Sequence, residues 1–212
     1  MPGPAFARGE TVSLHPIEEE DHEFIQYGRN HPDVRVPLTD TTIKTVEDVA
    51  EMLEDEDYHF LICVDEQSES TDGASSEGRS PSDRSSGRSP REDGETASTE
   101  GEDGDPEPVG VVAFGWVSSP GERGNLMYWV APECQGNGYV SEGTELFLDY
   151  AFGECGFHKV DARVLVPNEP SWKALEKLGF EREGRRRDDA IVEGEYVDAY
   201  SYGLLADEWL DN

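Results

Sequence analysis

Short runs rich in β-branched and aromatic residues alternate along the chain with stretches in which apolar residues recur at helical spacing. The runs predict strands at 11–17, 58–65, 109–117, 125–130, 159–166, 180–188 and 195–204. The spacing predicts helices at 18–29, 45–55, 140–153 and 170–178, and Thr45 and Asp48 stand at capping-box positions of the second. We find no internal repeat. This order predicts a single mixed α/β domain, residues 1–212, around one central sheet.

Residues 66–108 depart from this pattern. Of these 43 residues, 23 are Ser, Thr, Gly or Pro, and only Ala74 and Ala97 are apolar. Such a segment buries too little surface to offset its ordering entropy, so we expect an acidic, disordered, low-complexity insert. It separates the predicted strands 58–65 and 109–117, which indicates a β-hairpin whose turn has become a long loop. Lengthening a loop from about 5 to about 43 residues costs on the order of 2 kcal/mol, which a fold tolerates.

The chain carries 48 acidic and 17 basic residues, a net charge of −31. Binding to nucleic acid or to an anionic membrane needs clustered Lys and Arg, so this charge opposes both. Outside the insert, the chain still has 35 acidic and 13 basic residues, and the whole chain has four lysines. An acid-rich, lysine-poor surface stays hydrated in concentrated salt, which is typical of a halophilic organism, such as a halophilic archaeon. An acidic protein from an ordinary cytosol is the alternative.

Other global features narrow the class of protein further. No stretch approaches the ~18 apolar residues of a membrane span, and the first residues lack the basic and apolar regions of a signal peptide. The three cysteines, Cys63, Cys134 and Cys155, are widely spaced and indicate reduced thiols. The five histidines are isolated, so we expect no metal site. These features predict a soluble, cytoplasmic protein.

The most informative stretch is 128–141, where a predicted strand leads into a Gly-rich turn and a helix start. Gly136 and Gly138 allow the backbone to present successive N–H groups to an anion, and the helix adds the positive end of its dipole. A P-loop needs Gly-Lys-Ser/Thr, and a dinucleotide turn needs a third glycine; the chain has neither here. The Gln-x-x-Gly-x-Gly/Ala turn of acyl-CoA-dependent acetyltransferases fits Gln135 and Gly138, with Val140 at its small-residue position. By itself, the turn is equally compatible with a helix start that binds nothing.

A second element, Val166-Pro-Asn-Glu-Pro-Ser-Trp-Lys-Ala-Leu-Glu-Lys-Leu-Gly-Phe180, resembles the GNAT acetyltransferase superfamily. There an Asn-x-x-Ser pair, here Asn168 and Ser171, opens a helix that ends in Lys-Leu-Gly-Phe. The same residues also fit a helix cap followed by core leucines, and both interpretations can hold together. With Tyr128-Trp129 and the C-terminal run 183–209, the chain is similar to the branch that includes the Rim-type ribosomal-protein N-acetyltransferases. The resemblance covers residues 10–209 apart from the insert.

The resemblance implies a splayed central β-sheet flanked by helices, in which the fourth predicted strand separates from the fifth. The pantetheine arm of acetyl-CoA is expected in that gap, bonded to backbone near Tyr128 and Val130, and an N–H near Val130 would stabilise the oxyanion. Asn168 would position the cofactor or a water, and Ser171 would protonate the departing thiolate. The pyrophosphate is expected on the amides of Gln135, Gly136, Asn137, Gly138, Tyr139, Val140 and Ser141.

The sequence leaves the general base open. Members of this branch commonly carry Glu and Gly in the fourth strand, where this chain has Asn125 and Met127. Either an ordered water passes the proton to another acid, for which Glu122 and Asp161 are candidates by position, or the amine arrives neutral. Tyr200, in the last predicted strand, is a third candidate for proton transfer.

Together these features predict an N-acetyltransferase that moves acetyl from acetyl-CoA to a primary amine by direct attack in a ternary complex. The expected acceptor is a protein N-terminal α-amine, or else a small amine. We expect a monomer or homodimer with no nucleic-acid, membrane or metal partner. A non-catalytic acyl-CoA-binding sensor or partner module is the alternative; the loss of Glu at Asn125 favours it, and the presence of Asn168 and Ser171 opposes it.

Overall fold

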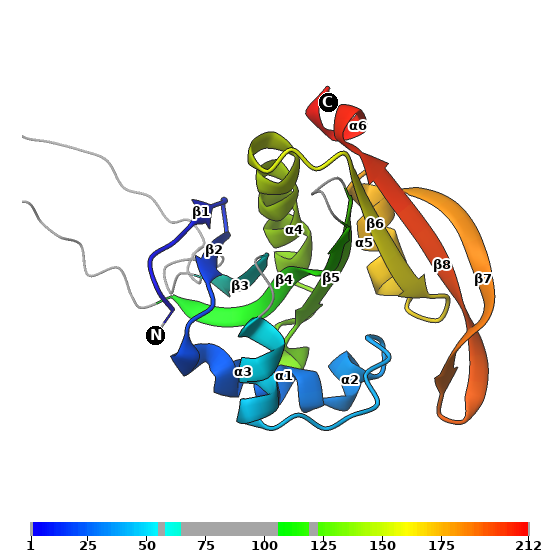
Figure 1. Cartoon of the computed structure of the whole chain (residues 1–212), viewed down its shortest axis with the longest axis horizontal. Coiled ribbons are helices and arrows are strands. Elements are labelled where there is room, and N and C mark those ends of the chain that lie inside the picture. The colour runs from blue at the N-terminus through cyan, green and yellow to red at the C-terminus, as the bar shows by residue number, and fades with distance from the viewer. Residues whose placement is uncertain (1, 55–57, 65–105, 119–122, 212) are drawn as a thin grey trace, which may run out of the picture.

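An eight-stranded sheet forms the centre of the computed structural model, which describes residues 2–54, 58–64, 106–118 and 123–211. Its strands lie in the order β1-β2-β3-β4-β5-β6-β8-β7 (Figure 1). The pair β5–β6 is parallel, and the other neighbouring pairs are antiparallel. The strands are β1 (Ala7–Arg8), β2 (Val12–Pro16), β3 (His59–Val64), β4 (Glu107–Ser118), β5 (Arg123–Val130), β6 (Lys159–Leu165), β7 (Glu181–Val192) and β8 (Glu195–Leu205).

Helices cover both faces of this sheet (Figure 1). One face carries α1 (His22–Asn30), α2 (Pro32–Arg35) and α3 (Val46–Glu54), and the other carries α4 (Tyr139–Asp149) and α5 (Glu169–Lys177). A π-helical turn, Tyr150–Glu154, continues α4, and α6 (Ala206–Leu210) follows β8. Within the described residues, no helix is long and apolar enough to cross a membrane.

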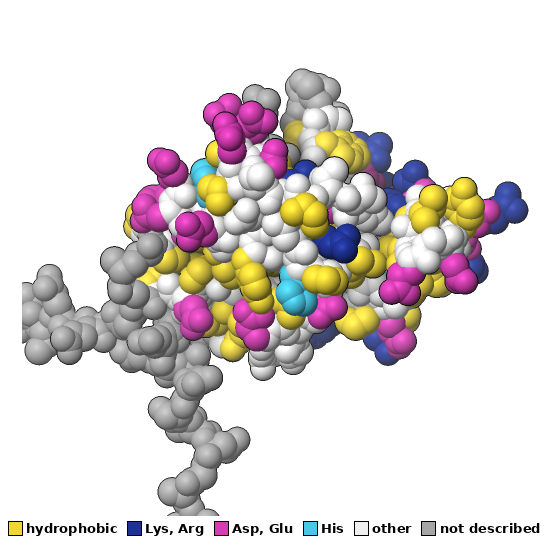
Figure 2. Space-filling view, turned by 90° about the horizontal axis from the view of Figure 1, so that it is seen from below, with side chains coloured by type: hydrophobic (Ala, Val, Ile, Leu, Met, Phe, Trp, Pro, Cys, Tyr) yellow, Lys and Arg dark blue, Asp and Glu magenta, His cyan; other side chains and the backbone are white. Residues whose placement is uncertain are grey.

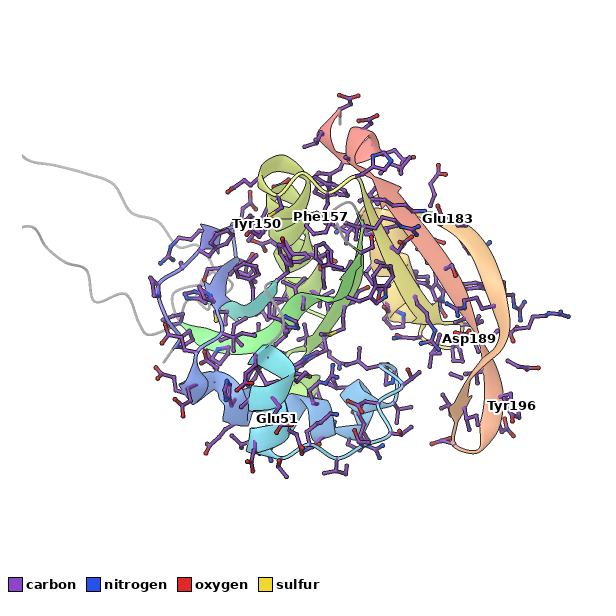
Figure 3. All side chains as sticks on the ribbon, viewed as in Figure 1. Glu51, Tyr150, Phe157, Glu183, Asp189 and Tyr196 are labelled. Atoms are coloured by element: carbon purple, nitrogen blue, oxygen red, sulfur yellow. The ribbon has the colours of Figure 1, made fainter. Side chains whose placement is uncertain are left out.

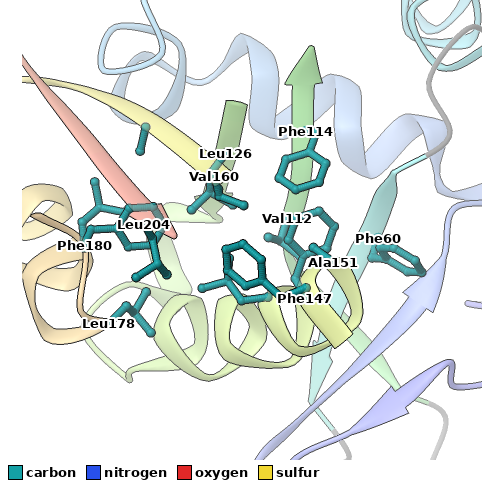
Figure 4. Packing of buried hydrophobic residues seen from close by; sticks show 14 of the residues in the cluster. Phe60, Val112, Phe114, Leu126, Phe147, Ala151, Val160, Leu178, Phe180 and Leu204 are labelled. Carbon is teal, nitrogen blue, oxygen red and sulfur yellow. The ribbon is translucent and has the colours of Figure 1, made fainter. Parts of the chain in front are cut away.

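Two hydrophobic clusters hold the helices on their faces. In the larger one, Phe147 of α4 packs against Phe114 of β4, with 4.7 Å between ring centroids (Figure 4). The second cluster joins Ile25 of α1 and Val49 of α3 to Trp129 of β5. Because side chains alternate along a strand, β5 contributes to both clusters. The strand β5 is therefore packed against hydrophobic side chains on both faces of the sheet.

The main predicted elements are confirmed, with small changes at their ends. The predicted helix at 18–29 begins with a 3-10 turn, Glu19–Asp21, before α1. The capping box at α3 is present: the amide of Thr45 donates to the Asp48 carboxylate at 2.7 Å, and the amide of Asp48 donates to Thr45 Oγ1 at 3.1 Å. The elements β1, α2 and α6 were not predicted, since elements of two to five residues are too short to show a period.

The hairpin with the long connection is also present. Val64 of β3 pairs with Glu107 of β4, so the two strands meet directly on either side of the connection. Of the segment 66–108 that we expected to be disordered, 66–105 lies outside the described residues. Glu107 and Pro108 belong to β4, so the predicted end of the insert is wrong. The strand includes Pro108 because the pairing shifts beside it in a β-bulge, where proline is tolerated.

The sheet divides between β5 and β6, as predicted. Their parallel pairing joins residues 123–126 to 159–162 and extends no further within the described residues. On its other side, β6 pairs with β8 along its whole length. The two parts of the sheet therefore touch only over the first halves of β5 and β6 and diverge beyond Leu126.

Candidate functional site

The gap between β5 and β6 contains a cavity of about 430 Å³. Its lining comes from both faces of the sheet: Tyr128 and Val164 pack on the α4–α5 side, whereas Met127 and Val34 belong to the α1–α3 side. The cavity therefore runs through the sheet from one face to the other. This passage exists because β5 and β6 stop pairing at Leu126.

The backbone of β5 faces the passage at alternate residues. The amide of Ala131 donates to the carbonyl of Val109 at 2.8 Å, which sets the phase of the β4–β5 ladder. Because the peptide groups of a strand point to its two neighbours in alternation, those of Tyr128 and Val130 point away from β4. Both residues lie beyond Leu126, the last residue of β5 that β6 pairs. The strand edge is thus open where the family resemblance implies a pantetheine arm.

A glycine turn closes the end of the passage next to α4. Gly136 and Gly138 have φ angles of 85° and 84°, in the left-handed region that favours glycine. Gly138 caps α4, and its carbonyl accepts the amide of Ser141 at 2.9 Å. The amides of Tyr139 and Val140, at the very start of the helix, have no intrahelical acceptor. A Cβ built on either glycine would meet no atom within 4 Å, so the turn borders open space. With the positive end of the α4 dipole, this geometry suits an anion.

Two amide side chains fasten the start of this turn. Gln135 Nε2 donates to the carbonyl of Val130 at 3.5 Å, and Asn137 Nδ2 donates to the carbonyl of Cys134 at 3.1 Å. Six of the seven residues predicted to hold a pyrophosphate line the cavity: Gln135, Gly136, Gly138, Tyr139, Val140 and Ser141. The seventh, Asn137, directs its side chain back to the loop instead.

Three predicted site residues, Tyr128, Asn168 and Ser171, meet in the wall of the passage. Asn168 caps α5, and its Oδ1 accepts the amide of Ser171 at 3.4 Å. The Tyr128 hydroxyl donates to the carbonyl oxygen of Ser171 at 3.1 Å and lies 3.0 Å from Ser171 Oγ. Because the single phenolic proton goes to the carbonyl, the Tyr128 oxygen is left to accept the Ser171 hydroxyl proton. Burial raises the pKa of Tyr128 to about 12, although the hydrogen bond with Ser171 partly offsets this rise.

The side chain of Tyr128 was not predicted as part of the site, since the resemblance implied only a backbone role for Tyr128. The contact with Ser171 spans 43 positions, so spacing could not reveal it. One signal was available. Tyr128 alternates with Leu126 in an apolar strand, and a tyrosine in such a strand needs a partner for its hydroxyl.

The two candidates for proton transfer that the structure describes, Asp161 and Tyr200, do not line the passage. Asp161 forms an ion pair with Arg123 at 2.6 Å and is not among the lining residues. Tyr200 also lies outside the lining, and its ring packs against the guanidinium of Arg182 at 4.6 Å. Glu122 lies outside the described residues.

The middle of the passage is uncharged on the β5 side. Asn125 lines it, and its amide donates to the carbonyl of Asp161 at 3.4 Å. Among the described lining residues, Asp33 supplies the single carboxylate, and its side chain is 68% exposed. In the described part of the chain, no group of three or more His, Cys, Asp or Glu side chains is arranged to hold a metal ion.

Comparison with known families decides what this arrangement represents. The family model described as an acetyltransferase (GNAT) domain matches residues 11–181, which is most of the chain. The chain belongs to the GNAT acetyltransferase family. This GNAT match includes the glycine turn, Asn168 and Ser171, and it ends before Tyr200. The resemblance drawn from the turn and the Asn-x-x-Ser pair is therefore confirmed at the level of the family.

Individual curated relatives match this chain at about 30% identity and over about half of its length. An uncharacterized N-acetyltransferase, p20, of Bacillus licheniformis is 30% identical over 49% of this chain and 58% of its own length. A putative ribosomal N-acetyltransferase, YdaF, of Bacillus subtilis is 31% identical over 47% of this chain and 55% of its own length. The chain thus spans about half the length of these curated relatives.

A solved structure shows the same fold over nearly the whole chain. The spermidine N-acetyltransferase from Vibrio cholerae, in complex with CoA and spermine, superposes with a TM-score of 0.71 at 18% identity. The superposition covers 95% of this chain and 99% of that chain. At this identity, the likeness establishes the GNAT fold and leaves the acceptor open.

Proposed function

We propose that this chain transfers the acetyl group of acetyl-CoA to a primary amine, and that its acceptor is the α-amine of a protein N-terminus. One observation carries the proposal: the passage between β5 and β6 brings an anion-binding turn, an open strand edge and a hydroxyl pair into one cavity. Membership of the GNAT family supports the reaction. The relative named as a putative ribosomal N-acetyltransferase supports the class of acceptor.

In this proposal, the glycine turn binds the pyrophosphate of acetyl-CoA. Backbone amides hold an anion without a basic side chain, which suits a chain of net charge −31. The amides of Gln135 and Ser141 already donate to the carbonyls of Pro132 at 3.4 Å and Gly138 at 2.9 Å, so the donors come from residues 136–140. The pantetheine arm follows β5, where the peptide groups of Tyr128 and Val130 supply its hydrogen bonds. Asn168, at the start of α5, positions the cofactor or a water.

The reaction is direct attack of the amine on the thioester carbonyl. The N–C bond forms, the C–S bond breaks, and the electron pair leaves on sulfur. A backbone N–H near Val130 stabilises the oxyanion. Ser171 then gives its hydroxyl proton to the thiolate, while the Tyr128 hydroxyl turns from the Ser171 carbonyl to Oγ and donates there. The proton that the amine releases returns through solvent to the hydroxyl pair.

The passage is uncharged on its β5 side, which favours an α-amine over other amines. Asn125 offers no carboxylate to deprotonate an incoming ammonium, so the amine must arrive neutral or lose its proton to water. An α-amine has a pKa of about 7.7–8.0, whereas a lysine-type amine has a pKa of about 10.4. Near pH 8, about half of the α-amines but less than about 1% of lysine-type amines are neutral.

Thiol release from acetyl-CoA tests this proposal. The assay is run in molar KCl with N-terminal peptides and small amines, and mass spectrometry identifies the acetylated product. We expect thiol release in step with acetylation of peptide α-amines, at rates that rise from pH 7 to 8.5. CoA binding without thiol release with any acceptor would support the non-catalytic acyl-CoA-binding module instead, which the uncharged Asn125 favours.

A further inference from the structure

The passage ends on the α1–α3 face in a small apolar pocket. Val34 of α2, Leu38 in the segment after α2, and Met127 of β5 line the cavity there. All three belong to, or pack against, the second hydrophobic cluster. Figure 2 looks onto this face, where hydrophobic side chains reach the surface between scattered acidic ones. The pocket and the glycine turn line the same cavity, and the pocket is the end at which the acceptor would enter.

Met127 is held in place from two elements. Arg29 of α1 donates from Nη1 to Met127 Sδ at 3.9 Å, and the same guanidinium pairs with Asp40 at 3.1 Å. Behind Met127, α1 contacts β5 closely: a Cβ on Gly28 would come within 2.2 Å of the Trp129 ring. Because α1, β5 and the segment after α2 are joined here, the wall that Met127 forms has little freedom to move.

The carboxylates around this pocket are mostly neutralised. Asp40 is paired with Arg29, and Asp189 is paired with Arg163, which lines the cavity, and with Arg186 at 2.8 Å. Figure 3 shows Asp189 on the β7–β8 hairpin. Asp33, mostly exposed, is the one carboxylate among the described lining residues. In molar salt, charges more than about 3 Å away are screened. The net charge of −31 therefore does not create a polycation site at this pocket.

We infer that the pocket of Val34, Leu38 and Met127 takes the uncharged side chain of the first residue of the acceptor, and that Met127 limits its size. The inference rests on the proposed acetyl transfer and narrows its acceptor. An apolar pocket with one exposed carboxylate gives no compensation for burying a positive charge beside the reacting amine. Polyamines and N-termini that begin with lysine are therefore poor substrates.

Peptides that differ only in their first residue test the charge rule. Met and Lys have similar lengths, so a Met-first and a Lys-first peptide differ at this pocket mainly in charge. We expect the parent chain to acetylate the Met-first peptide with at least a tenfold higher kcat/KM than the Lys-first peptide or spermidine. Equal or better turnover of the Lys-first peptide or of spermidine would overturn the inference but leave the proposed acetyl transfer standing. The proposed function fails in a different way, with no acetylation of any acceptor.

The size rule is tested with Met127→Ala. We expect the ratio of kcat/KM for a Phe-first peptide to that for an Ala-first peptide to rise at least fivefold, with CoA affinity retained. Met52→Ala is the matched control, because Met52 of α3 packs against the same cluster without lining the cavity. It makes the same chemical change and should leave the ratio as in the parent. An unchanged ratio in Met127→Ala, or an equal change in both variants, would show that Met127 does not set the size limit.

Discussion

The hydroxyl oxygen of Tyr128 lies 3.0 Å from Ser171 Oγ, across the split in the sheet. Tyr128 belongs to β5 and Ser171 to the first turn of α5, which follows β6. A second bond, from the same hydroxyl to the Ser171 carbonyl at 3.1 Å, fixes the geometry. The two diverging parts of the sheet are thus connected through the side chain that we propose as the proton donor.

Tyr128→Phe removes this connection while keeping the ring. We expect turnover to fall by about tenfold with CoA affinity near normal, since proton delivery matters in the transition state. Ser171→Ala should give a similar loss of kcat. If the two hydroxyls act as one unit, the double variant loses little more than either single variant. Additive losses would show that Tyr128 and Ser171 act independently.

The pH dependence gives a second readout on the same pair. Burial raises the pKa of Tyr128 to about 12, so the phenol stays protonated from pH 6 to 10. Tyr128→Phe should therefore lower the pH–rate profile of kcat without moving its inflections. A shifted inflection below pH 10 in the variant would mean that Tyr128 ionises during turnover.

Glu142 connects the first turn of α4 to the start of β2. Its Oε1 accepts the amides of Thr11 at 2.7 Å and Val12 at 3.2 Å. Burial alone would raise the pKa of Glu142, but these hydrogen bonds outweigh it and hold the pKa below that of an ordinary glutamate. A lowered pKa means that the carboxylate stabilises the fold above its unfolded-state pKa, and that this stabilisation is lost as pH falls through the folded value.

Glu142→Gln should consequently lower the thermal midpoint at pH 7 and lower it less below pH 4. Differential scanning calorimetry across this range is the measurement. Glu145→Gln is the control, because it removes the same charge from an exposed position of the same helix. A pH-independent difference between the parent and Glu142→Gln would contradict the role of the ionised carboxylate.

Gly28 tests the contact between α1 and β5. A Cβ at this position would lie 2.2 Å from the Trp129 ring, so Gly28→Ala must displace packed atoms. We expect a loss of about 1–3 kcal/mol in unfolding free energy, although alanine would stabilise an unobstructed helix by up to about 1 kcal/mol. Gly153→Ala, where a Cβ meets nothing within 4 Å, should be neutral or stabilising. Stabilisation by Gly28→Ala in urea unfolding would contradict the packing.

Salt should stabilise the chain. A net charge of −31 repels itself in dilute buffer, and raising the salt from 0.1 to 1 M shortens the screening length from about 10 to about 3 Å. We expect the thermal midpoint to rise steadily with KCl over this range. A midpoint that does not change with KCl would count against adaptation to concentrated salt.

Most of the fold could be predicted from the sequence, because the patterns that indicate helices and strands are local. The apolar alternation of β6 and the capping box of Thr45 and Asp48 each fall within a few residues, and the structure has both. The division of the sheet was foreseen in another way, from the resemblance carried by the glycine turn and by Asn168 and Ser171. Its physical cause, the end of β5–β6 pairing at Leu126, involves strands far apart in the chain.

What could not be foreseen depends on distant residues meeting. The Tyr128–Ser171 contact, the pairing of Asp161 with Arg123 and the pocket beside Met127 each join separate elements. Nor does any local pattern mark α2, a four-residue helix whose Val34 lines the cavity. The acceptor specificity that we propose depends on the pocket beside Met127, so the sequence alone left it open.

The central claim is that the passage binds acetyl-CoA with its pyrophosphate on the glycine turn. Calorimetric titration of CoA into the parent chain and Gly138→Asp tests this claim most directly. Gly194→Asp is the control, because Gly194 has a φ of 87° and lies in the β7–β8 turn, away from the cavity. We predict that Gly138→Asp, shown to be folded by circular dichroism, raises the Kd for CoA at least about tenfold, or about 1.4 kcal/mol, and that Gly194→Asp leaves it unchanged. Parent-like CoA affinity in folded Gly138→Asp would contradict the account and reduce the glycines to a strand-to-helix turn.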